Sequence, residues 1–104
     1  MILYHATLKS RLPSILRHGL LCSKSKGRLK VVWLHTSNKS SWAALHTVKR
    51  HGGRVEAVVV LELSVPRRWL RRSRKGLWYS VRDLPAHRVR RALAFGEVAG
   101  ALAG

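Results

Sequence analysis

The stretch Val55-Glu56-Ala57-Val58-Val59-Val60-Leu61-Glu62-Leu63 is almost continuously apolar and rich in β-branched side chains. A short apolar run of this kind is typical of a strand that is buried on both faces of a sheet. Glu62 interrupts the run near its end. The segment therefore predicts the centre of a β-sheet, around which the rest of the chain can be placed.

Shorter runs on both sides of this stretch predict the other strands. Residues 2–5 form an apolar run that starts almost at the first residue, and residues 31–35 have the β-branched and aromatic content of a strand. Residues 76–81 predict another strand, and residues 89–95 predict a last strand or a short helix. Residues 22–30 are polar and basic, which predicts a loop.

A first helix is predicted directly after the N-terminal strand. Leu12, Ile15 and Leu16 recur at the i, i+3, i+4 spacing of an apolar helix face. Pro13 falls in the first turn, where proline is tolerated, and Gly19 follows where a helix commonly ends. We expect a short helix that packs these apolar residues against the sheet.

A second helix is predicted between residues 38 and 52. Asn38 is a favoured N-cap residue, and Trp42, Leu45 and Val48 fit the spacing of a buried helix face. The two glycines at residues 52–53 end the pattern. On this interpretation Trp42 belongs to the core.

The remaining segments complete a single domain. After Pro66, residues 67–72 predict a helical turn whose Trp69 and Leu70 pack inward while its arginines face outward. No internal repeat or linker is visible. We therefore predict one α+β domain over residues 1–95, with strands split between two halves and two to three short helices. Residues 96–104 form a tail rich in small residues.

Charge is the strongest compositional signal. The chain has 21 Lys and Arg residues against four Asp and Glu residues, a formal net charge of +17. So many positive charges repel one another and attract polyanions, so nucleic acid is the expected partner, with RNA favoured over DNA. The alternative is a GC-rich genome, in which arginine is frequent at surfaces for mutational reasons.

Other composition features restrict the kind of protein further. Cys22 is the only cysteine, which excludes an internal disulfide framework and a Cys-rich zinc site. His46 and His51 have no carboxylate nearby, so no metal site is expected. No apolar stretch is long enough to span a membrane, and the N-terminus does not have the pattern of a signal peptide. We expect a cytoplasmic protein without a membrane partner.

Three segments in order carry a family pattern: Leu3-Tyr4-His5-Ala6-Thr7, then Val31-Val32-Trp33-Leu34-His35-Thr36-Ser37, then Gly76-Leu77-Trp78-Tyr79-Ser80. The first leads into a helix and the pair Gly19-Leu20. Over about residues 3–91 the chain resembles the NAD-using ADP-ribosyltransferase superfamily. It is most similar to the transferase lobe of the RNA 2′-phosphotransferases. This resemblance implies a small split β-sheet with a cleft for NAD.

His5 is the first candidate for chemistry. It lies at the end of a strand beside Thr7, where a side chain can reach a cleft and bond a ribose hydroxyl. The resemblance gives it that role with NAD, whereas the alternative is a partly buried histidine that bonds only to backbone. The resemblance places the following residues at the cofactor: His5, Ala6, Thr7, Trp33, His35 and Ser37.

The catalytic residues depend on the acceptor. Most ADP-ribosyltransferases carry a glutamate on the strand that corresponds to residues 76–81, but here the matching position is Leu77 or Trp78. Neither side chain can accept a proton. A phosphate acceptor is already an anionic nucleophile, so it needs cations that position it rather than a base. Catalysis is therefore assigned to His5, Arg28, Arg50 and Arg82.

A further basic set is assigned to phosphate or nucleic acid. It consists of Lys24, Lys26, Lys30, Arg72, Arg74 and Trp78. Arginine suits phosphate because its planar fork can bond two oxygens at once, and an exposed tryptophan can stack on a base. The alternative for each cation taken singly is a solvated surface charge.

Three functions remain open from the sequence. The first is an NAD-dependent transferase acting on nucleic acid, with removal of an RNA 2′-phosphate as the leading form. The second is direct ADP-ribosylation of DNA, RNA or protein by a toxin or phage effector, with His35 as an unconventional base. The third is a basic nucleic-acid-binding domain that has lost the cofactor.

Overall fold

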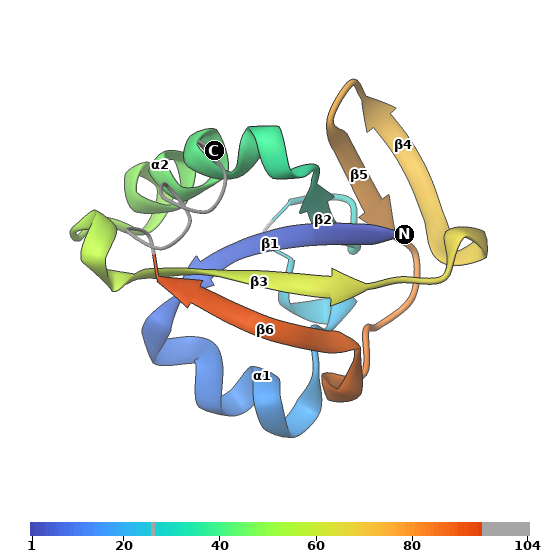
Figure 1. Cartoon of the computed structure of the whole chain (residues 1–104), viewed down its shortest axis with the longest axis horizontal. Helices are drawn as coiled ribbons and strands as arrows, with labels where there is room; N and C mark the ends of the chain where they lie inside the picture. The colour runs from blue at the N-terminus through green and yellow to red at the C-terminus, as the bar shows by residue number, and fades with distance from the viewer. Residues whose placement is uncertain (26, 95–104) are drawn as a thin grey trace.

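The described residues of the computed structural model, 1–25 and 27–94, form a mixed α+β fold built on a six-stranded antiparallel sheet (Figure 1). The strand order is β4-β5-β2-β1-β3-β6. The strands are β1 (Ile2–Leu8), β2 (Val32–His35), β3 (Val58–Ser64), β4 (Leu70–Arg74), β5 (Leu77–Ser80) and β6 (Val89–Ala94). The expected tail at residues 96–104 lies outside the described residues.

The sheet divides in the middle. β1 pairs with β3 along its whole length, from Ile2 to Leu8, but it pairs with β2 at a single position, Tyr4 opposite His35. The strands β4, β5 and β2 therefore form one half, and β1, β3 and β6 form the other. All six strands belong to one sheet, and this single pairing joins its two halves.

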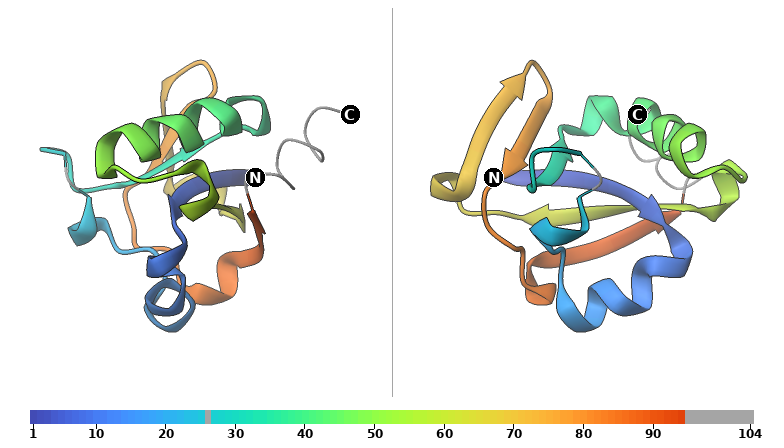
Figure 2. Two further views of the ribbon diagram at one scale, coloured as in Figure 1. Left: turned by 90° about the vertical axis from the view of Figure 1, so that its left-hand side faces the viewer. Right: turned by 180° about the vertical axis from the view of Figure 1, so that it is seen from behind.

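Two helices cover the sheet. They are α1 (Leu12–His18) and α2 (Ser40–His51), and they lie on opposite sides of β1 and β3 (Figures 1 and 2). The remaining helical turns are short: η1 (Lys9–Arg11), η2 (Cys22–Lys24), η3 (Ser37–Lys39), η4 (Val55–Ala57), η5 (Arg67–Trp69) and η6 (Ala86–Arg88). None of the helices in residues 1–25 and 27–94 is long and apolar enough to cross a membrane.

The central strand is buried as its composition predicts. Every residue of β3 from Val58 to Leu63 is buried. Leu61 and Leu63 belong to the main apolar core on the α1 side, whereas Val60 packs with Tyr4 on the other face. Burial on both faces explains why this strand has no polar alternation apart from Glu62.

Glu62 stays charged inside the sheet because it has several partners. Its carboxylate accepts hydrogen bonds from the Tyr4 hydroxyl at 3.2 Å and from Arg91 Nε at 3.0 Å, and Arg90 lies 3.6 Å away. Burial acts to raise the pKa of Glu62, but Arg91 first and then Tyr4 and Arg90 outweigh it together, so that pKa is lowered. The charge that interrupts the apolar run thus ties β1, β3 and β6 together.

The predicted buried face of the second helix is wrong. Trp42 and Leu45 are 51% and 55% exposed, and Val48 is only half-buried. The side chains that α2 buries are small: Ser40, Ala43, Ala44 and Thr47. Small side chains allow the helix to approach β1 closely, and this packing outweighs the apolar spacing of the larger residues.

Three other local predictions differ from the structure. Asn38 does not cap α2, because it lies inside η3 and its side chain accepts a hydrogen bond from Thr36. Leu16 is 55% exposed, while Ile15 and the partly buried Leu12 make the contact of α1 with the core. The predicted helical turn at residues 67–72 ends at Trp69, which packs against the core as expected.

The segment after that turn is an edge strand. β4 begins at Leu70 and pairs with β5 across a tight turn that contains Gly76 at φ 80°. Its residues from Arg71 to Arg74 are exposed. Local sequence did not reveal this strand because its stability depends on pairing with β5 rather than on its own apolar content.

Candidate functional site

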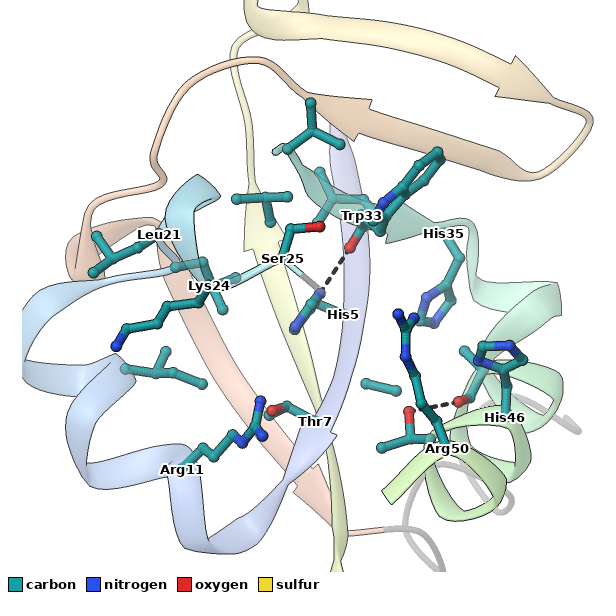
Figure 3. A pocket seen from close by; sticks show the side chains of 18 of the residues that line it. His5, Thr7, Arg11, Leu21, Lys24, Ser25, Trp33, His35, His46 and Arg50 are labelled. Atoms are coloured by element: carbon teal, nitrogen blue, oxygen red, sulfur yellow. Dashed lines mark hydrogen bonds between the residues drawn. The ribbon is translucent and has the colours of Figure 1, made fainter. Parts of the chain in front are cut away.

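A pocket of about 900 Å³ lies where the two halves of the sheet diverge (Figure 3). Residues of β1, β2, α1, α2 and the β4–β5 hairpin contribute to its wall. The volume is within the range of small-molecule and cofactor sites. The division of the sheet therefore creates the cavity in which candidate residues can be sought.

His5 projects from β1 into this pocket and is held in one orientation. Its Nδ1 lies 2.7 Å from the backbone carbonyl oxygen of Trp33 on β2. A carbonyl oxygen can only accept, so Nδ1 carries the proton. In the neutral ring Nε2 is then an acceptor, and no bond to it is seen among the described residues. His5 therefore offers a fixed lone pair to a ligand.

The surroundings of His5 favour its neutral form. Burial lowers the pKa of His5, the hydrogen bond to Trp33 partly opposes this, and the positive charge of Arg11 lowers the pKa further. The ring therefore remains an acceptor at neutral pH. A ribose hydroxyl is one group that could donate to it.

His35 lines the same pocket but is enclosed. It is 4% exposed, and its Nε2 lies 3.1 Å from the hydroxyl oxygen of the fully buried Ser40. Burial, followed by the charge of His5, lowers the pKa of His35 to about 4. Its ring also stacks on Tyr4 at a centroid distance of 6.1 Å. These contacts make His35 a support of the wall more than a base open to substrate.

Cations surround the pocket from two sides. Arg11 and Lys24 lie on the α1 side, and Arg50 lies on the α2 side (Figure 3). Arg74 adds a fourth cation from β4. None of the described residues in the wall is acidic. The cavity therefore suits an anionic ligand, and particularly one with phosphate groups.

The described acids lie outside the pocket wall. Glu62 is held in the sheet by its arginines, and Glu56 is exposed in η4. The carboxylate of Asp83 accepts a hydrogen bond of 2.7 Å from the backbone N–H of Cys22. Glu97 lies outside the described residues. Leu77 lines the pocket at one of the positions where the resemblance would place a glutamate.

Two exposed tryptophans line the pocket. Trp33 is 40% exposed and its ring lies 5.3 Å from that of Tyr79 on the neighbouring strand. Trp42 is stacked on His46, with ring centroids 5.2 Å apart. Both indoles are large apolar surfaces next to cations, an arrangement that suits the stacking of a nucleobase or nicotinamide ring.

The structure gathers only part of the predicted site. The predicted residues that line the pocket are His5, Ala6, Thr7, Lys24, Trp33, His35, Arg50 and Arg74. Those that do not line it are Arg28, Lys30, Ser37, Arg72, Trp78 and Arg82. Lys26 lies outside the described residues. The residues of β1 and β2 that were predicted to bind the cofactor thus all line the pocket, whereas only one of the three predicted catalytic arginines does.

Each residue outside the pocket has another location. Lys30 donates a 2.7 Å hydrogen bond to the backbone oxygen of Ser25 within its own loop. Trp78 packs against the core, and Arg72 lies over its ring at 6.0 Å. Ser37 is exposed at the start of η3. The loop cation Arg28 is exposed as well.

Sequence reasoning missed Arg11, Trp42 and His46 as wall residues. Arg11 directly precedes α1. The sequence could have indicated it, because it follows the strand that carries His5. Trp42 was assigned to the core because its spacing fitted a buried face. The correct face of α2 could only be known from its packing on β1.

No group of three or more His, Cys, Asp or Glu residues in the described part of the chain could hold a metal ion. No protein-family model matches the sequence, and no curated protein matches it either.

Proposed function

We propose that this domain is an NAD-dependent transferase of the ADP-ribosyltransferase fold that acts on nucleic acid, with an RNA 2′-phosphate as the leading acceptor. One observation carries the proposal. A pocket between two sheet halves combines a neutral, oriented His5 with four cations and with no acid among its described wall residues.

The wall residues suit the parts of NAD. His5 Nε2 would accept a hydrogen bond from a ribose hydroxyl, and the backbone at Ala6 in the same wall would hold the nicotinamide amide. Trp33 offers a stacking surface, and Arg11 with Lys24 can neutralise the diphosphate. The division of the sheet supports the resemblance stated above, because the family fold is a split sheet with a cleft for NAD.

The choice of acceptor follows from the missing acid. A hydroxyl or amide acceptor must lose a proton, and no carboxylate of the described residues lies in the wall to take it. A phosphate needs no such base. One of its oxygens would form a bond to the ribose carbon of NAD while the carbon–nitrogen bond breaks and its electron pair leaves with neutral nicotinamide. Attack of the neighbouring ribose hydroxyl on phosphorus would then break the bond to the RNA 2′-oxygen, which would leave and take up the proton of that hydroxyl. Arg50 and Arg74 are placed to orient that phosphate.

Direct ADP-ribosylation is the second candidate, and one observation favours it. The free Nε2 of His5 could take the proton of a hydroxyl or amide acceptor. His35, the base suggested by sequence, is less suited because it is buried and bonded to Ser40. The products differ: this reaction leaves ADP-ribose on the acceptor, whereas phosphate transfer leaves an acceptor without its 2′-phosphate.

The first test is calorimetric titration with NAD at fixed salt. We expect wild type to bind NAD and His5→Ala to bind at least tenfold more weakly, because the mutant loses the oriented acceptor. His18→Ala is the matched control, since His18 is exposed on α1 outside this pocket. An absence of NAD binding by folded wild type up to millimolar concentration would overturn both enzymatic functions.

The second test identifies the acceptor. A short RNA with one internal 2′-phosphate is incubated with NAD, and the RNA and the released nicotinamide are measured. Loss of the phosphate together with nicotinamide release supports phosphate transfer. A stable ADP-ribose adduct on an RNA without 2′-phosphate would instead support direct ADP-ribosylation.

A further inference from the structure

Three arginines converge on one indole ring outside the pocket. The guanidinium carbons of Arg68, Arg82 and Arg88 lie 5.8, 5.7 and 5.3 Å from the ring centre of Trp69. We call these four residues the Trp69 cluster. They come from η5, from the residues after β5 and from η6, so the fold brings together three elements within residues 68–88. None of the four lines the pocket.

The cluster has an uncompensated positive charge. Among residues 1–25 and 27–94, the only ion pairs join Glu62 to Arg90 and Arg91. Asp83 follows Arg82 directly, but its carboxylate bonds the backbone of Cys22. Contact with an indole face offsets part of the repulsion between guanidinium groups. Three like charges around one ring still favour an anion among them.

The cluster also has donors without acceptors. Trp69 Nε1 and Arg88 Nε are both enclosed, and neither has a hydrogen-bond partner. Both groups can only donate. The cluster therefore holds two side-chain donors that no described group satisfies, and a phosphate oxygen is an acceptor of the kind they lack.

Access to the cluster and its connection to the pocket are favourable. Arg68 and Arg82 are exposed, and Arg88 is half-buried. Between the cluster and the pocket, the β4–β5 hairpin carries Arg72 over Trp78 and then Arg74 in the pocket wall. The hairpin extends away from the body of the sheet (Figure 1). The cations of β4 therefore lie between the cluster and the pocket.

We propose that the Trp69 cluster is a second binding site, which holds backbone phosphates of a nucleic-acid strand whose reacting group lies in the pocket. The inference rests on the proposed function for the identity of the acceptor as nucleic acid. The binding of phosphate by the cluster does not depend on that function, since guanidinium forks supported by an indole face bind phosphate oxygens whether or not NAD binds. This assigns Arg82, placed by sequence reasoning in catalysis, to substrate binding.

The test compares two triple variants of equal charge. R68Q/R82Q/R88Q removes the cations of the cluster, and K9Q/K49Q/R54Q removes three exposed cations outside both the cluster and the pocket wall. Binding of a labelled single-stranded RNA is measured by fluorescence anisotropy over a range of salt concentrations. Each neutralised phosphate contributes about 0.7 to the slope of log affinity against log salt on a single strand.

We expect the cluster variant to bind RNA at least tenfold more weakly than the control variant at low salt. Its salt slope should be lower by about 2, which corresponds to three lost phosphate contacts. Equal weakening of the two variants would overturn the proposal, because total charge alone would then account for binding.

Two further measurements separate the outcomes. NAD titration of the cluster variant should match wild type, since these arginines are outside the pocket. If wild type fails to bind NAD but the cluster variant still loses RNA selectively, the proposed enzyme activity fails and the second site stands. R68K/R82K/R88K keeps the charge and tests the fork itself: at least threefold weaker RNA binding is expected, and wild-type affinity would overturn the proposal.

Discussion

At the scale of single residues, His35 shows how burial sets chemistry. The ring is 4% exposed and bonded to Ser40, and burial with the nearby His5 lowers its pKa to about 4. The unfolded chain would protonate near the ordinary value of 6.5. The folded protein therefore binds fewer protons than the unfolded chain between pH 6.5 and about 4, and acid favours unfolding there.

We predict that stability falls as pH decreases from 7 to 4, and that His35 contributes about 3 kcal/mol to this loss. The lowered pKa of His5 acts in the same direction. Chemical denaturation at several pH values measures the effect. His35→Gln should show a flatter profile above pH 5, whereas His18→Ala should retain the wild-type slope. A wild-type profile independent of pH would contradict the burial of a neutral ring.

At the scale of elements, the end of α1 shows a close contact that determines where the pocket wall lies. Gly19 has φ 80° and ψ −170°, and its N–H bonds the carbonyl oxygen of Ile15. Leu20 and Leu84 then exchange two hydrogen bonds of 2.8 Å. A Cβ atom on residue 19 would lie 2.2 Å from the carbonyl oxygen of Leu84, which is too close for any real contact.

We predict that Gly19→Ala destabilises the fold more than Gly52→Ala. Gly52, at the end of α2, has a nearly identical backbone, with φ 75° and ψ 175°, but nothing lies within 4 Å of its added Cβ. The strained backbone alone costs about 1–3 kcal/mol. The clash in Gly19→Ala should add at least about 1 kcal/mol, measured by thermal or urea unfolding. Equal losses would show that the chain at Leu84 moves aside freely.

At the scale of the whole molecule, the charge of +17 opposes folding. Most cations are exposed, and the ion pairs among the described residues use only Glu62. Repulsion between exposed charges is screened by salt, since the Debye length falls from about 30 Å at 0.01 M to about 3 Å at 1 M. The folded state should therefore gain more from added salt than the expanded unfolded chain does.

We predict that the melting temperature rises by several degrees between 20 mM and 500 mM NaCl. K9Q/K49Q/R54Q, which carries three fewer positive charges, should melt higher at low salt and show a smaller rise. Differential scanning calorimetry measures both. A melting temperature that is unchanged or falls with salt would mean that self-repulsion does not limit the stability of the fold.

Only the three-dimensional fold decided the membership of the site. Apolar spacing predicted a helix between residues 38 and 52, and α2 spans Ser40–His51, but the same spacing put Trp42 in the core. The face that a helix buries depends on how closely it can approach its neighbour, and α2 approaches β1 through Ala43 and Ala44. Arg11 lines the pocket although the sequence did not predict it, and Arg82 lies over Trp69 although the sequence predicted it in the site. In both cases the path of the chain between strands decides where the arginine lies, and the local sequence does not show that path.

The sequence by itself determined the α+β class, the buried central strand β3, the two helices and the excess of positive charge. It also indicated His5 as a residue that a ligand could reach, but it wrongly placed His5 at the end of a strand, because β1 continues to Leu8. These properties follow from composition and spacing, which act within a few residues. The single pairing of β1 with β2 and the pocket that it opens join segments far apart in the chain, and the Trp69 cluster joins three separate elements, so all of them depend on tertiary packing.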